Sequence, residues 1–105
     1  MKLFRKGAEH DERLVGSWKV DPDDAAAVAE YGQATVEFRA GGSLLYAIDT
    51  GDSDQIMRMT WQTGGGQLVT DQPSAPREER TRYDVEGNQL TLRLSGFESR
   101  WLRTS

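Results

Sequence analysis

The sequence contains no cysteine and only one histidine, His10, in 105 residues. Without cysteine the chain can form neither a disulfide framework nor a thiolate metal site, which favours a reducing compartment and leaves the hydrophobic core to hold the fold. One histidine supplies neither a nucleophilic triad nor a zinc site. The sequence therefore predicts no catalytic residue, no metal and no cofactor. An enzyme stays a third alternative, for which Arg58 and Asp49 are the first residues to check.

Long hydrophobic runs are also missing. The first residues, MKLFRKGAEHDER, begin with basic side chains but lack the apolar run of about 7 to 15 residues that a signal peptide needs. No stretch approaches the length of a transmembrane helix. These absences predict no membrane insertion and a cytoplasmic location, although a chain whose export signal had been removed would read the same way.

Basic clusters free of acidic residues are absent as well. The chain has 13 basic and 17 acidic side chains and a formal net charge of −4. The densest charged run, residues 77–82, alternates in sign and is typical of the solvated face of a strand. Nucleic acid is therefore excluded as an expected partner.

What the chain does contain is enough for one small domain. We expect a flexible polar lead-in over residues 1–12 and a single folded domain over residues 13–105. The one helical pattern covers residues 22–31, where Asp21 could cap the helix and Gly32 could end it. Because this helix is too short to be stable alone, Val28, Ala29 and Tyr31 are expected to rest on apolar surface.

Elsewhere the apolar residues recur with period two, which is typical of strands. The expected strands cover residues 14–20, 34–39, 43–49, 55–62, 67–71, 79–85, 89–94 and 99–103. Two short turns set their register: a glycine turn places Phe38 opposite Leu44, and Gly87-Asn88 places Val85 opposite Leu90.

These strands predict an all-β fold, an eight-stranded antiparallel up-and-down barrel with one short helix between the first and second strands. An open sheet of eight strands would expose one apolar face and two free edges, whereas a closed barrel removes both. Closure places the first strand beside the last. Gly16 would then leave room for the inward indole of Trp18, and a guanidinium from Arg100 or Arg103 could lie on that indole.

Gly16, Trp18 and the arginine of the final strand resemble the barrel-closing residues of the lipocalin-like proteins of the calycin group, in particular small bacterial-type members. The resemblance covers residues 14 to 104 and implies a barrel closed at one end by Trp18, with an open end that admits an apolar small molecule. Two features depart from it. The chain is shorter than a full-length lipocalin and lacks its C-terminal helix, and the helix after the first strand is closer to fatty-acid-binding barrels.

An eight-stranded barrel is just wide enough to be filled by its own side chains or to hold one small ligand. The first hypothesis is therefore a binding protein for a small apolar or aromatic ligand, with Tyr46, Tyr83 and an inward arginine orienting it. The predicted cavity-lining residues are Trp18, Phe38, Tyr46, Met59, Trp61, Tyr83 and Trp101.

The alternative is a filled barrel that acts as a protein–protein interaction or inhibitor module with an unidentified protein partner. The expected register places Leu45, Val69 and Leu102 on outward faces, where they could form a contact patch. In the strands at residues 55–62 and 99–103, either face could be the inward one.

Overall fold

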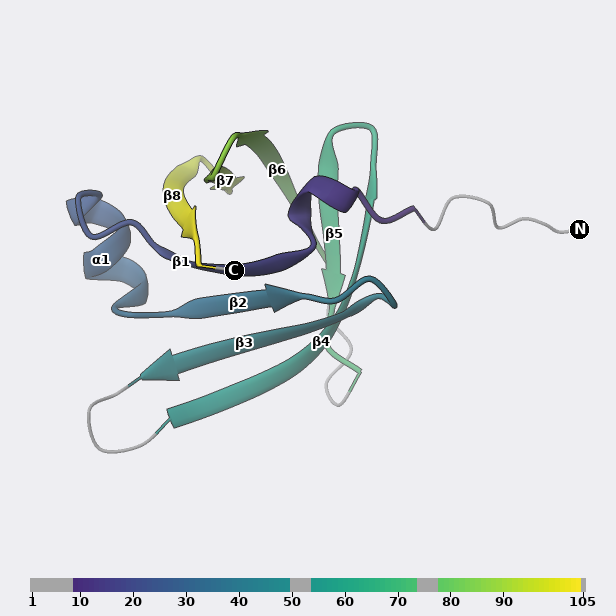
Figure 1. The fold of residues 1–105 in the computed structure, drawn as a ribbon, viewed down its shortest axis with the longest axis horizontal. Coiled ribbons are helices and arrows are strands. Elements are labelled where there is room, and N and C mark those ends of the chain that lie inside the picture. Colours follow the sequence, from purple (N-terminus) through teal and green to yellow (C-terminus); the bar gives the residue numbers. More distant parts are fainter. Residues whose placement is uncertain (1–8, 50–53, 74–77, 105) are drawn as a thin grey trace, which may run out of the picture.

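Eight strands and one α-helix make up the described part of the chain, residues 9–49, 54–73 and 78–104 of the computed structural model (Figure 1). Residues 1–8 of the expected lead-in and the side chain of Asp49 lie outside the described part. In chain order the elements are η1 (Glu12–Leu14), β1 (Gly16–Val20), α1 (Ala25–Tyr31), β2 (Thr35–Phe38), β3 (Ser43–Asp49), β4 (Asp54–Gly64), β5 (Gln67–Asp71), β6 (Glu79–Glu86), β7 (Gln89–Leu94) and β8 (Phe97–Arg103).

The predicted closed up-and-down barrel is confirmed. Each strand pairs antiparallel with the next, and β8 pairs back with β1. At this closing junction Trp18 lies opposite Arg103, and Val20 lies opposite Trp101. The Asp21 N–H donates to the Arg100 carbonyl at 2.9 Å, so the junction continues one residue past the end of β1.

The two local turns have the predicted register. Phe38 pairs with Leu44, and Val85 pairs with Leu90. In the first turn Gly42 has φ 97°, a conformation that glycine adopts without strain. The chain also turns earlier than expected before β8, because Phe97 already belongs to that strand and pairs with Leu94.

Helix α1 begins at Ala25, three residues later than predicted. The Asp21 side chain accepts the Asp23 N–H at 2.9 Å, which holds this segment in a turn. The N-cap is therefore Asp24, whose carboxylate accepts the Ala27 N–H at 3.1 Å, and Gly32 ends the helix as predicted. The expectation for Val28 and Ala29 is wrong, since both are exposed, Val28 to 38%, whereas Ala27 is the helix residue with 0% exposure.

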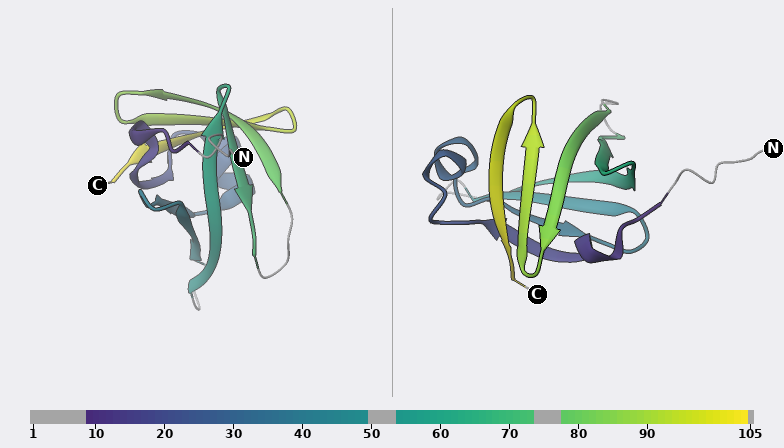
Figure 2. Two further views of the ribbon diagram at one scale, coloured as in Figure 1. Left: turned by 90° about the vertical axis from the view of Figure 1, so that its right-hand side faces the viewer. Right: turned by 90° about the horizontal axis from the view of Figure 1, so that it is seen from above.

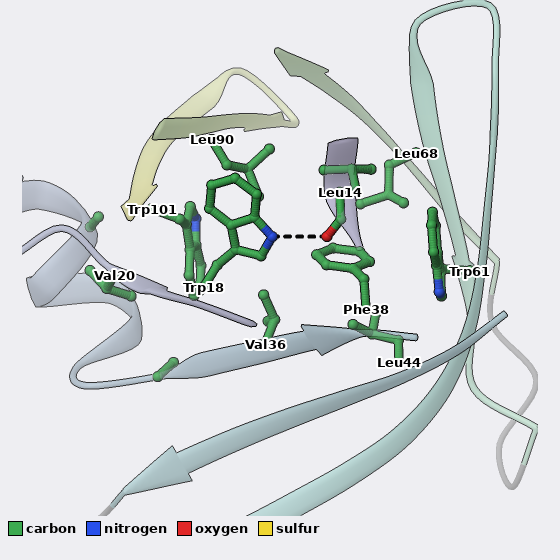
Figure 3. Packing of buried hydrophobic residues seen from close by; sticks show 12 residues of the cluster. Leu14, Trp18, Val20, Val36, Phe38, Leu44, Trp61, Leu68, Leu90 and Trp101 are labelled. Carbon is green, nitrogen blue, oxygen red and sulfur yellow. Dashed lines mark hydrogen bonds between the residues drawn. The ribbon is translucent and has the colours of Figure 1, made fainter. Parts of the chain in front are cut away.

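The core is a single cluster inside the barrel (Figure 3). Its buried members are Leu14, Trp18, Val20, Ala27, Ala34, Val36, Phe38, Leu44, Trp61, Leu68, Leu90 and Trp101. In β8 the inward face is the one that carries Ser99 and Trp101, both buried. The prediction that Val69 belongs to an exposed contact patch is wrong. Val69 lies on the outward face of β5 but is only 8% exposed. Its register partners Gln62 and Arg80 are long enough for their stems to cover it.

The two ends of the barrel differ. Helix α1 lies across one end, and η1 lies at the other (Figure 2). Leu14 of η1 is fully buried, so it plugs the end at which it lies.

Candidate functional site

The indole of Trp18 seals the end that Leu14 plugs. Trp18 has 0% exposure, and its Nε1 donates to the Leu14 carbonyl at 2.9 Å (Figure 3). The guanidinium carbon of Arg103 lies 4.2 Å from the centroid of the indole. Arg103 also donates to the carbonyls of Val15 at 2.9 Å and Arg13 at 2.6 Å. One side chain of the last strand therefore covers the first indole and ties down the chain that leads into β1.

Arg100, the other arginine proposed for this role, serves a different part of the fold. It has the opposite parity in β8, and its Nε lies 3.6 Å from Asp21 Oδ2. Its backbone N–H donates to Asp24 Oδ2 at 2.9 Å. Arg100 thus holds the start of α1, while Arg103 closes the barrel.

The backbone conformation at position 16 explains why a glycine occurs two residues before Trp18. Its φ of 129° lies in a region that residues with a Cβ atom rarely adopt. The residue pairs with Phe38 and joins η1 to β1, so the chain bends here as it enters the sheet. Whether Gly16 also leaves space for the indole stays a prediction.

Four of the seven predicted cavity-lining residues lie in the packed core, each no more than 2% exposed: Trp18, Phe38, Trp61 and Trp101. The indole N–H of Trp61 donates to the Arg39 carbonyl, and that of Trp101 donates to Ser99 Oγ, both at 2.9 Å. The rings of Phe38 and Trp61 meet edge to face at 5.1 Å. These aromatics can form the floor of a ligand site, but their polar atoms are already satisfied. Their contact with a ligand stays a prediction.

Part of the inward wall of the barrel is less completely buried than the core. Tyr46, Met59 and Leu92 occupy inward positions and pack against the core, yet all three stay partly exposed. Tyr31, the last residue of α1, and Phe97, the first residue of β8, complete this group, with ring centroids 6.0 Å apart. We name these five residues the helix-side mouth.

Tyr31 connects the mouth to the core. Its ring centroid lies 5.6 Å from that of Trp101. Burial raises the pKa of Tyr31, and the negative charge of Glu30 raises it further. Burial likewise raises the pKa of Tyr46, with further contributions from Tyr31 and Glu30. Both phenols therefore stay neutral at physiological pH and can donate a hydrogen bond.

Tyr83, the remaining predicted lining residue, is engaged elsewhere. Its hydroxyl donates to Asp11 Oδ2 at 2.7 Å. The same carboxylate accepts from the Arg13 guanidinium at 2.8 and 3.1 Å. The hydrogen bonds from Arg13, more than those from Tyr83, hold the pKa of Asp11 well below its usual range despite some burial. Tyr83 therefore anchors the incoming chain at the plugged end.

Residues 9–11 contact the barrel, although the sequence predicted a flexible lead-in at these positions. We name these three residues the strap. The Thr63 N–H donates to the Glu9 carbonyl at 2.7 Å, and the Asp11 N–H donates to Thr63 Oγ1 at 3.1 Å. The His10 ring meets Trp61 edge to face at 4.9 Å. The described part of the lead-in thus contacts the barrel, whereas the domain boundary at residue 13 stays a prediction.

Among the described residues, no group of three or more His, Cys, Asp or Glu side chains is placed to hold a metal ion. Within the same ranges, no helix is long and apolar enough to cross a membrane. Compared with known proteins, the chain matches no family model, no curated protein and no solved structure.

Proposed function

We propose that this barrel binds a small apolar or aromatic molecule in the helix-side mouth, in the manner of a lipocalin-like protein. One observation carries the proposal. Tyr46, Met59 and Leu92 face inward like the buried core residues but remain partly exposed, so part of the inward wall still has surface to offer. A site bounded by apolar and aromatic side chains with a few polar groups is typical of small-molecule binding.

In this proposal, different side chains make the apolar contacts and the hydrogen bonds to the ligand. Met59 has a flexible thioether that adapts to the shape of an apolar ligand. The neutral hydroxyls of Tyr31 and Tyr46 can donate a hydrogen bond to a carbonyl or hydroxyl at the edge of the ligand. Since the Tyr83 hydroxyl is held by Asp11, we assign the orienting role to Tyr46 and Tyr31. A cytoplasmic location is part of this proposal.

Tryptophan fluorescence tests the site with a matched pair of variants. Trp101 lies beside Tyr31 at the mouth, whereas Trp61 contacts His10 of the strap at the plugged end. Titration with fatty acids, retinoids and an apolar dye should change the emission of the wild type and of Trp61→Phe. The change should be much smaller in Trp101→Phe, because that variant lacks the reporter nearest the ligand. Circular dichroism checks that both variants fold.

Two outcomes contradict the proposal. The first is no saturable response to any ligand class in the wild type. The second is a response that survives Trp101→Phe and disappears in Trp61→Phe, because the ligand would then bind at the strap and not beneath α1.

One observation favours the alternative, an interaction or inhibitor module that works through its outer wall. Ile56 lies on the outward face of β4 and is 60% exposed, and Leu45 of the adjacent strand is half-buried. A photo-cross-linker at position 56 should then capture one protein partner that a cross-linker at exposed position 80 does not. Equal capture from both positions contradicts the alternative.

A further inference from the structure

A hollow of about 630 Å³ lies between α1 and the strands β1 to β3. The residues that define it include Lys19, Val20, Pro22, Val28, Ala34 and Ala47. Lys19 and Ala47 alternate along their strands with the inward residues Trp18 and Tyr46, so they face outward. We name this hollow the outer groove. It is separate from the helix-side mouth.

Val28 is an exposed apolar residue of α1 that lines the outer groove. The helix is attached to the barrel by buried Ala27, by the bond from the Arg100 N–H to Asp24, and by the Tyr31 ring. Val28 is 38% exposed and lines the groove. A β-branched residue is also less favourable than alanine in a short exposed helix.

The apolar surface continues beyond the groove along one cross-strand row. Ala47 of β3 pairs with Ile56 of β4, which is 60% exposed. Val28 and Ile56 are two of the three large hydrophobic side chains that stand out as exposed in the described part of the chain. The groove and this extension offer continuous apolar surface to a chain or ring system.

Lys19 carries the only charge among the described lining residues of the groove. It is exposed, and its neighbours across the sheet, Thr35 on β2 and Leu102 on β8, are uncharged. An ammonium group at the rim of an apolar hollow complements a ligand that has an anionic head and an apolar body. The volume lies within the range of about 300–1,000 Å³ found for small-molecule sites.

We propose that the outer groove binds a small amphiphilic carboxylate, with its apolar body against Val28, Pro22 and Ala47 and its carboxylate on Lys19. This site is independent of the ligand proposed for the barrel interior. The apolar body gains affinity by covering exposed surface, and Lys19 selects the charge of the head group.

An NMR titration of ¹⁵N-labelled protein with decanoate, decylammonium and decanol, each below its micelle concentration, tests the proposal. Decanoate should shift the amides of Val28, Ala34 and Ala47 saturably and bind more tightly than decylammonium. Val28→Asp should weaken decanoate at least tenfold, because it places a carboxylate in the groove and removes apolar contact. The matched control Ala26→Asp, at an exposed position on the same helix, should leave the affinity unchanged.

Lys19→Gln gives a second test at an exposed position where misfolding is not expected. It should weaken decanoate about two- to fivefold, the range of one exposed ion pair, and leave decanol unchanged. The proposal is overturned if decanoate and decylammonium bind equally, or if the shifts centre on Tyr46 and Met59, which would place the ligand in the interior. Binding of none of the three amphiphiles also overturns it and leaves the groove to a protein partner. Trp101 fluorescence tests binding in the helix-side mouth independently of the NMR titration of the outer groove. Either proposal can therefore be rejected while the other stands.

Discussion

Arg103 joins the two ends of the chain through one side chain. Its guanidinium lies 4.2 Å from the Trp18 ring centroid and also donates to backbone carbonyls of the segment before β1. Arg103→Met keeps much of the apolar stem but loses these interactions. We expect a loss of about 2–3 kcal/mol in the free energy of unfolding, measured by urea denaturation. The matched variant Arg100→Met should lose about 1 kcal/mol or less, because its ion pair is partly exposed. Equal losses would contradict the role of Arg103.

The positive φ of Gly16 should make this position intolerant of a side chain. Because its φ is 129°, Gly16→Ala should lower the free energy of unfolding by about 1–3 kcal/mol. Gly41 is a suitable control, since it has no positive φ and a Cβ there would meet nothing within 4 Å. Gly41→Ala should change the stability by less than about 0.5 kcal/mol. If Gly16→Ala is equally mild, the backbone does not require glycine at this position.

At the scale of elements, α1 depends on a cap that also reaches β8. One oxygen of Asp24 accepts the Ala27 N–H, and the other accepts the Arg100 N–H at 2.9 Å. Asp24→Ala should therefore cost about 1–2 kcal/mol, as for a strong N-cap, in urea denaturation. Asp23→Ala, one residue earlier at an exposed position, should cost less than about 0.5 kcal/mol. A small effect of Asp24→Ala would show that α1 is held by Tyr31 and Ala27 alone.

The strap makes the stability of the folded protein depend on pH. The pKa of Asp11 is lower in the folded protein than its unfolded value of about 4. The stabilisation is therefore complete above about pH 5 and is lost as the pH falls towards the folded pKa. Wild type should exceed Asp11→Asn in stability at about pH 7, and this difference should shrink in urea denaturation as the pH falls to about 2. Glu12→Gln, an exposed neighbour, is the control. A difference that stays constant with pH would contradict the role of Asp11.

In the molecule as a whole, the strand registers that are confirmed are those that depend only on local sequence. The pairs Phe38–Leu44 and Val85–Leu90 follow from the length of one turn and alternation in the flanking strands. The choice between Arg100 and Arg103 was not local, since it depends on which face of β8 meets β1. The start of α1 was also set from outside the segment, by the ladder bond from Asp21 and the contact of Asp24 with β8.

The candidate site could be predicted only in part for the same reason. Tyr46 and Met59 follow from strand parity, whereas Tyr31 reaches the mouth only because α1 folds back onto β8. The link between Asp11 and Tyr83 joins residues 72 positions apart, and no local pattern in a polar segment indicates it. The outer groove likewise needs α1 to lie beside the β1–β3 wall.

The proposal that a ligand binds inside the barrel beneath α1 can be tested by intermolecular NOEs. A protein with ¹³C-labelled methionine and isoleucine methyl groups would be saturated with a neutral naphthalene probe. If the ligand binds there, the probe should show NOEs to the inward methyl of Met59. NOEs confined to the outward methyl of Ile56, or no NOE at saturation, would contradict it.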